Sequence, residues 1–358
     1  MQDWDPVSFT DLKGWDEDDH QAALACFRMS ARGFADSASV TRQAVQSSSG
    51  LRAVAKKALS VDMNSIGRNE ARSFFEDNFQ PHRHKNNSGF VTAYFEPEVQ
   101  ASRIRTDEYP YPLYRRPHDL VKIDKSNPPD GVSPGLEYAR KIGDRYVDFY
   151  DRGAIDNGAL ADRDLELFWL RSAVEGFYIH VQGSARLSFS DGSSARVSYA
   201  GKTGHPYTSI GKELVAQGTF VVEEANMTNI RAWLEEDESR GLEMLHRNKS
   251  FIFFAEVKGH DPEFGPIAAA GVQLTPGRSL AVDKSIHAYG TPVWLETDKP
   301  LPSDSRPFKR LMIAQDTGSA IVGPQRGDIF IGSGDEAGMI AGAVRHDTEF
   351  VILVPKDV

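Results

Sequence analysis

Short apolar segments separated by glycine and proline run from residue 251 to the end of this 358-residue chain, and they constrain its fold most strongly. Apolar segments bounded by turn residues are typical of β-strands. One short helix is expected among them, at 336–343. Many short strands at this spacing favour a small closed β-barrel. The expected strands are 251–255, 280–282, 293–295, 311–314 and 350–354.

The preceding residues divide into a helical N-terminal part and a β-rich middle part. Helices are expected through the first 80 residues, and the acidic pair Asp18 and Asp19 favours a helix start directly before an apolar run. In the middle part, Asp191-Gly192 marks a hairpin turn between two strands. The further expected elements are helices at 165–174, 209–217 and 227–236 and strands at 90–95, 177–181, 185–189 and 195–199.

The composition of the chain argues against several classes of protein. Hydrophobic residues make up 40% and charged residues 26%, which is enough apolar material for a sizeable core and unlike a disordered chain. A net charge of −10 disfavours a nucleic-acid partner, because phosphate binding needs a basic face. The single cysteine, Cys26, lies in an apolar helical run and is expected in the core. It leaves no disulfide within the chain and no cysteine-based metal site.

Three aspartates, Asp283, Asp316 and Asp328, each adjoin an apolar strand-like segment. A carboxylate at a strand end is expected at the rim of a barrel, where a ligand can reach it. Glycines around the three aspartates allow backbone to approach that ligand closely. They stand at 318, 323, 327, 332 and 334. The alternative is that these aspartates only cap glycine-rich turns.

Asp316-Thr317-Gly318-Ser319 also matches the signature of aspartic peptidases. Such enzymes need two aspartates that share a proton. A single chain of this length should carry a second such signature, and the sequence has none. The peptidase therefore stays a minor alternative.

A second polar cluster lies in the middle part, in His-Val-Gln-Gly-Ser at 180–184 and in the segment 198–207. Its amide, hydroxyl, amine and aromatic groups suit a sugar, although a pair of polar turns would look similar. The histidines at 180 and 205 lack metal-ligand spacing, so no metal site is expected. The candidate substrate-binding residues here are Gln182, Gly183, Ser184, Tyr199, Lys202, Gly204 and Tyr207.

Several longer motifs resemble those of the membrane-bound lytic murein transglycosylase A family. They are Thr-x-Tyr-x-x-Pro at 92–97, Tyr-Pro-x-Tyr-Arg at 111–115, the two middle segments, and a C-terminal three-aspartate "3D" region. The 3D region shows as Arg-Ser-Leu-Ala-Val-Asp at 278–283, Asp-Thr-Gly at 316–318 and Arg-Gly-Asp-Ile-Phe at 326–330. The resemblance extends from about residue 8 to about residue 355.

The resemblance implies a mainly β fold with flanking helices and two domains. A six-stranded double-psi β-barrel would be built from 1–95, with N-terminal helices, and 250–358. A second, β-barrel-like domain would be inserted at 96–249, and a groove between the domains would hold the glycan.

The resemblance also implies a mechanism with no cofactor. Asp328 would protonate the glycosidic oxygen between N-acetylmuramic acid and N-acetylglucosamine, and then act as a base, while Asp316 and Asp283 would support it. Neighbouring carboxylates would raise the pKa of Asp328. Thr92 and Tyr94 are further candidate substrate-binding residues. A non-catalytic glycan-binding protein on the same fold is the other alternative.

The implied partner is the peptidoglycan glycan strand, with cell-wall synthesis or division proteins as further candidates, and the chain is expected to be a monomer. The implied location is the periplasm of a Gram-negative bacterium, in association with the outer membrane. The N-terminus as numbered has no signal segment or lipid-attachment motif, and no run of 18 apolar residues occurs. Lipid anchoring is therefore not expected from these residues. Position 319 is serine where the family commonly has glycine.

Overall fold

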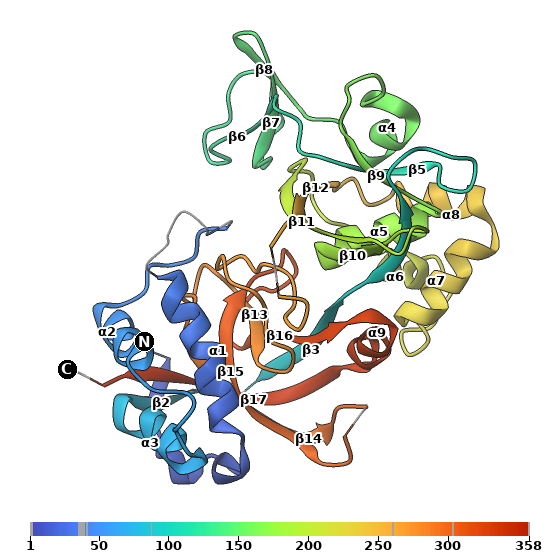
Figure 1. The fold of residues 1–358 in the computed structure, drawn as a ribbon. Helices are drawn as coiled ribbons and strands as arrows, with labels where there is room; N and C mark the ends of the chain where they lie inside the picture. The colour runs from blue at the N-terminus through green and yellow to red at the C-terminus, as the bar shows by residue number, and fades with distance from the viewer. Residues whose placement is uncertain are drawn as a thin grey trace. The chain divides into compact units, whose positions relative to one another are not determined.

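A computed structural model describes residues 3–34, 40, 42–86, 88–259, 261–302 and 304–356. The chain forms two compact units (Figure 1). The first unit comprises Met1–Phe95 and His260–Val358, and the second comprises Glu96–Gly259. The described part of the chain contains no helix that is long and apolar enough to cross a membrane.

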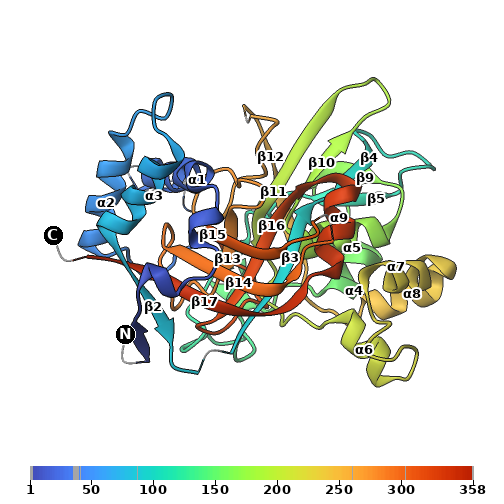
Figure 2. The ribbon, with the colours of Figure 1, turned by 90° about the horizontal axis from the view of Figure 1, so that it is seen from below.

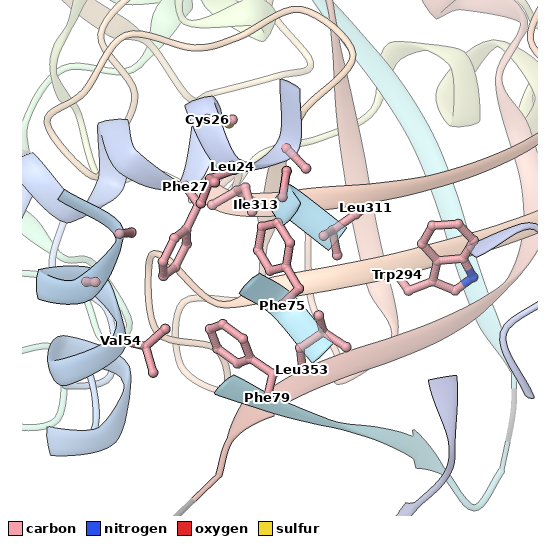
Figure 3. Packing of buried hydrophobic residues seen from close by; sticks show 14 of the residues in the cluster. Leu24, Cys26, Phe27, Val54, Phe75, Phe79, Trp294, Leu311, Ile313 and Leu353 are labelled. Atoms are coloured by element: carbon pink, nitrogen blue, oxygen red, sulfur yellow. The ribbon is translucent and has the colours of Figure 1, made fainter. Parts of the chain in front are cut away.

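Helices from the N-terminal part pack on one side of the first unit. The side chain of Asp19 accepts a hydrogen bond from the backbone of Ala22 and caps the longest of them, as the acidic pair predicted. These helices bury aromatic side chains such as Phe27 and Phe75 against sheet residues such as Trp294 (Figure 3). Cys26 is fully buried there, as predicted. The helices are η1 (Phe9–Asp11), η2 (Trp15–Glu17), α1 (His20–Gly33), α2 (Ser49–Leu59), α3 (Arg68–Asn78) and, later in the chain, α9 (Gly334–Ala343).

The first unit contains a sheet in the order β1-β2-β17-β14-β15-β13-β16-β3 (Figure 1 and Figure 2). Strand β17 also pairs with β3, with Arg345 opposite Thr92. Alternate residues such as Val91, Ile329 and Phe350 point into a second apolar core, whereas Val351 and Leu353 on the opposite face of β17 pack against the helices. The strands are β1 (Trp4–Pro6), β2 (Phe79–His84), β3 (Gly89–Glu96), β13 (Ser279–Val282), β14 (Pro292–Pro300), β15 (Pro307–Asp316), β16 (Arg326–Ser333) and β17 (Arg345–Pro355).

The second unit contains a six-stranded sheet in the order β12-β11-β10-β4-β9-β5 and a three-stranded sheet β6-β7-β8. Its strands are β4 (Glu98–Ser102), β5 (Tyr111–Tyr114), β6 (Leu120–Lys122), β7 (Tyr138–Ile142), β8 (Arg145–Val147), β9 (Glu166–Leu170), β10 (Ser184–Ser188), β11 (Ser194–Lys202) and β12 (Ile252–Val257). Its helices are α4 (Arg152–Ala154), η4 (Ile155–Ala159), α5 (Ala173–Gln182), α6 (Ile210–Ala216), α7 (Met227–Glu236) and α8 (Glu238–Leu245).

Two predicted elements of the second unit have the opposite type. The expected strand at 177–181 is part of helix α5, which Ser172 caps at its start and Gly183 ends in a left-handed conformation with φ of 79°. Half of the expected helix at 165–174 is strand β9, which pairs with β4 and β5, and only residues 173 and 174 are helical, at the start of α5. Apolar runs of this length do not distinguish a buried helix from a strand, whereas the capping residues do.

Strand β12 also lies in a different unit from the one expected. The sequence-based boundary at 249/250 placed this strand with the C-terminal part of the chain. In the structure it pairs antiparallel with β11 and completes the six-stranded sheet of the second unit. Its side chains Phe253 and Phe254 are fully buried there.

Candidate functional site

The strand register of the first unit brings Asp316 and Asp328 to the same part of the sheet. Ala281 on β13 is paired with Asp316 on β15 and with Asp328 on β16. Residues in register across neighbouring strands share a face, and strands lie about 4.8 Å apart, so the two aspartates lie roughly 10 Å apart at the backbone. The structure thus gathers two of the three predicted aspartates on one face.

Asp328 is held by a hydroxyl group and is partly withdrawn from solvent. Thr92 on β3 donates a hydrogen bond to Asp328 Oδ1, and Arg326 Nη2 donates to Thr92 Oγ1 over 2.7 Å. Burial raises the pKa of Asp328 to about 6, with a smaller contribution from Asp316, while Thr92 and Arg326 act in the opposite direction. The predicted rise of this pKa is therefore confirmed, but its main cause is burial rather than like charge. A carboxyl group with this pKa can act as an acid near neutral pH.

Asp316 is fixed through both of its carboxylate oxygens. The Tyr94 hydroxyl donates to Oδ2 over 2.9 Å, and the backbone N–H of Ala269 donates to Oδ1 over 3.0 Å. The guanidinium group of Arg42 lies 3.7 Å from Oδ1. Burial and the Asp316 charge hold the pKa of Tyr94 well above its usual range, so Tyr94 remains a hydrogen-bond donor. These contacts make Asp316 a fixed charge beside Asp328.

Asp283 has a different environment from the other two aspartates. Its Oδ1 accepts hydrogen bonds from the Ser285 backbone over 2.9 Å and the Ser285 hydroxyl over 2.6 Å, and its Oδ2 accepts from the Gly323 backbone over 2.8 Å. Burial alone would raise the pKa of Asp283, but these hydrogen bonds outweigh it and lower that pKa. The Asp283 side chain therefore ties two loops together, as the turn alternative described.

The two predicted polar segments of the second unit lie side by side. Gln182 ends helix α5, Gly183 follows it, and Ser184 begins strand β10 in a buried position. Ser184 pairs with Ser198 on β11, and the backbone N–H of Tyr199 donates to the Gly183 carbonyl over 2.8 Å. Antiparallel pairing of β10 and β11 thus joins the two motifs.

The remaining predicted residues of this cluster lie at the end of β11 and directly after it. Lys202 Nζ lies 2.8 Å from Glu137, a partner that no sequence signal singled out. Gly204 adopts φ of +89°, and a side chain there would meet the backbone N of Tyr138 at 2.9 Å, so this position requires glycine. Tyr207 keeps 43% of its surface exposed. This second unit therefore offers an amine and an exposed aromatic ring within the segment 198–207.

Some residues of the first-unit site were not predicted individually. Arg326 belongs to the Arg-Gly-Asp-Ile-Phe motif, but the motif did not assign it a role. Ala269 and Arg42 had no sequence signal, because loops bring them to Asp316. Among the described residues, no group of three or more His, Cys, Asp or Glu side chains is placed to hold a metal ion.

Comparison with known protein families identifies two domains in the chain. Residues 90–255 match the MltA specific insert domain, and residues 278–354 match the 3D domain. The crystal structure of a membrane-bound lytic murein transglycosylase from Agrobacterium tumefaciens is 42% identical, with a TM-score of 0.90 over 98% of this chain and 97% of that chain. The chain belongs to the MltA family of lytic murein transglycosylases. Membership in this family sets the aspartic-peptidase alternative aside.

Other relatives in the MltA family match at lower identity. Membrane-bound lytic murein transglycosylase A of Escherichia coli K12 is 36% identical over 263 residues, which are 71% of this chain and 62% of that protein. The aligned region thus spans less than two thirds of this curated relative. The crystal structure of E. coli MltA with bound chitohexaose is 32% identical, with a TM-score of 0.63 over 81% of this chain and 79% of that chain.

Proposed function

We propose that this chain cleaves the β-1,4 bond between N-acetylmuramic acid and N-acetylglucosamine in peptidoglycan without using water. The observation that carries this proposal is the carboxyl group of Asp328, whose pKa burial raises to about 6 within the segment that matches the 3D domain. The chitohexaose bound to the E. coli relative supports a glycan as the ligand.

The proposed reaction needs one acid/base group. Asp328 donates its proton to the glycosidic oxygen as the bond to C1 of the muramoyl residue breaks. The resulting carboxylate accepts the proton of the muramoyl 6-hydroxyl as that oxygen bonds to C1, which closes a 1,6-anhydro ring and restores the acid. An intramolecular hydroxyl has a high effective concentration, so no second carboxylate is required to activate water.

Asp316 has a supporting role in this mechanism. Its two oxygens already accept hydrogen bonds from Tyr94 and Ala269, which makes it a poor candidate for a second, water-activating base. Its fixed negative charge helps to keep Asp328 protonated. Asp283 supports the site indirectly, through the loops that it joins.

The polar cluster of the second unit is proposed to bind the glycan. Lys202 and Tyr207 supply a charged donor and an exposed ring, which are groups that suit sugar hydroxyls and ring faces. Thr92 and Tyr94, which the sequence predicts to bind substrate, are proposed to hold the carboxylates instead. This assignment follows from their hydrogen bonds to Asp328 and Asp316.

The first unit is proposed to form the double-psi β-barrel of the family. The pairing of β17 with β3 supports this, because it links the two ends of the series β17-β14-β15-β13-β16-β3. The proposed location is the periplasm, in association with the outer membrane, since the curated relatives are named membrane-bound. We also propose that the protein is a monomer and that it acts on peptidoglycan strands, alone or together with cell-wall proteins.

The test is to digest murein sacculi with the purified protein in ¹⁸O-water and to analyse the released muropeptides by mass spectrometry. Anhydromuramoyl ends without ¹⁸O are expected, because the attacking oxygen belongs to the sugar. Stoichiometric ¹⁸O at the new muramoyl end would identify a hydrolase. Binding to sacculi with no release of product would identify the non-catalytic glycan-binding alternative.

A further inference from the structure

The hydroxyl group of Thr92 lies between a cation and the proposed acid. Arg326 Nη2 donates to Thr92 Oγ1 over 2.7 Å, and Thr92 Oγ1 donates to Asp328 Oδ1. We propose that Arg326 is a positioning residue that orients the Thr92 hydroxyl and thereby leaves Oδ2 of Asp328 as the oxygen that transfers the proton. This inference rests on the proposed function, because it refines the role of Asp328 as the acid.

A hydroxyl group has one proton and two lone pairs, whereas a guanidinium group can only donate. Since Arg326 occupies one lone pair of Thr92 Oγ1, the hydroxyl proton is directed away from Arg326 and toward Asp328 Oδ1. Oδ1 is then an acceptor in both protonation states of Asp328, and the acid proton resides on Oδ2.

The guanidinium group of Arg326 is itself held in place. It donates to the Gly327 carbonyl, and its central carbon lies 5.4 Å from the centre of the Phe90 ring. Phe90 and Thr92 are two residues apart on β3, so they lie on the same face and contact the same guanidinium group. A planar donor fixed on three sides can direct a hydroxyl group at little entropic cost.

Thr92 and Arg326 also act on the acidity of Asp328. Both favour its carboxylate form, so loss of either raises the pKa of Asp328, while Asp316 on β15 acts in the opposite sense. The neighbouring elements carry further charged groups. Among them are the exposed Arg345 and Asp347 on β17, which pair with Thr92 and Phe90, Asp283 at the end of β13, which accepts hydrogen bonds from Ser285 and Gly323, and the exposed Asp335 and Glu336 on α9.

The kinetic test compares Arg326→Met and Thr92→Val with the wild type on sacculi. In both variants we expect kcat to fall about 10- to 100-fold, because a misdirected proton donor is costly, while KM stays within about twofold. The basic limb of the pH–rate profile should move to higher pH in both, since Asp328 keeps its proton longer. Thr92→Ser, which retains the hydroxyl, should restore kcat and the profile. Arg306→Met, which removes an exposed arginine of the same unit, is the control for general charge effects.

A double variant separates orientation from a direct effect of the cation. In the Thr92→Val background, Arg326→Met should lower kcat by no more than about twofold further, because the hydroxyl that Arg326 directs is absent. Losses that multiply in full would show that Arg326 acts on the reaction independently of Thr92, and would overturn the proposal.

A measurement without substrate distinguishes this inference from the proposed function. The pKa of Asp328 can be followed by carboxyl ¹³C NMR, with the signal assigned through Asp328→Asn. A higher pKa in Thr92→Val and in Arg326→Met supports the positioning role, even if the wild type releases no anhydro product and the proposed function fails. An unchanged pKa in both variants, in a protein that does release anhydro product, overturns the positioning role alone.

Discussion

The polar groups of the two units are assembled in different ways. In the first unit, Asp316 and Asp328 come together with Thr92, which is distant in the sequence, through the register of neighbouring strands, and their side chains hydrogen-bond to fixed partners. In the second unit, the polar groups come from two short segments joined by one hairpin, and Lys202 and Tyr207 remain partly exposed. The first arrangement shifts proton affinities, whereas the second presents binding groups. Substitutions should therefore change the rate and its pH dependence in the first unit, and affinity in the second.

The largest expected effect is that of Asp328→Asn. This variant keeps the size of the side chain and removes the transferable proton, so turnover of sacculi should fall by about 10²–10⁴-fold with glycan binding retained. Asp335→Asn, on the exposed start of α9, is the matched control. Retention of more than about a tenth of wild-type turnover would mean that another residue is the acid.

The same variant makes a prediction for stability. Burial raises the pKa of Asp328 to about 6 in the folded state, whereas its pKa in the unfolded state is about 3.9. Ionisation of Asp328 therefore destabilises the folded state progressively as the pH rises from about 3.9 to about 6. Removing the charge should therefore leave the melting temperature of Asp328→Asn equal to or above that of the wild type at pH 8. The two melting temperatures should converge near pH 4. A clearly lower melting temperature of the variant at pH 8 would contradict the assigned cause of the pKa shift.

Much of the first unit could be predicted from the sequence because its strands are short and clearly punctuated. Strands around 280–282, 311–314 and 350–354 and the helix at 336–343 are present near their predicted positions. The pairing of β17 with β3 could not be predicted, because it depends on contacts between residues more than 200 positions apart. The apolar run of helix α5 predicts a strand, because a run of this length is also typical of a buried strand and only its capping residues indicate a helix.

The candidate site was predictable as a set of residues but not as a set of contacts. The aspartates stood out as strand-end carboxylates, yet the sequence did not distinguish Asp283, which accepts hydrogen bonds within its loops, from Asp316 and Asp328. That difference depends on which backbone N–H groups face each carboxylate in the folded chain. Arg326 gave no individual signal, because its importance depends on its reach across to Thr92.

An intermediate effect is expected for Asp316→Asn. Its charge contributes to the raised pKa of Asp328, so its removal should lower that pKa and move the basic limb of the pH–rate profile to lower pH. Two unit charges roughly 10 Å apart interact by about 0.4–1.7 kcal/mol at effective dielectric constants between about 80 and 20. The rate near neutral pH should therefore fall by about twofold to twentyfold, with little change near pH 5.

Asp283→Asn tests whether that shift belongs to Asp316 alone. The Asp283 carboxylate accepts its hydrogen bonds from Ser285 and Gly323, so its substitution should lower the melting temperature and leave the basic limb in place. The two profiles are best recorded side by side on sacculi. Equal shifts in both variants would contradict the division of the three aspartates made here.

The smallest effect is expected for Lys202→Met in the second unit, where affinity rather than rate should change. The substitution keeps the apolar stem and removes the ammonium group, so the dissociation constant for a muropeptide chain should rise about 3- to 10-fold, which corresponds to the loss of about one hydrogen bond. Lys202 also lowers the pKa of Glu137 through their hydrogen bond. That contribution to stability is present above the unfolded pKa of Glu137 and is lost as pH falls, so the melting temperature of Lys202→Met should be slightly lower than that of the wild type at pH 7 and equal to it at pH 3.

Lys125→Met is the matched control, because Lys125 lies 3.5 Å from the same carboxylate but outside the motif. It should reproduce a small change in stability without a change in affinity, whereas equal losses of affinity in both variants would show that general charge, and not the position of Lys202, attracts the glycan.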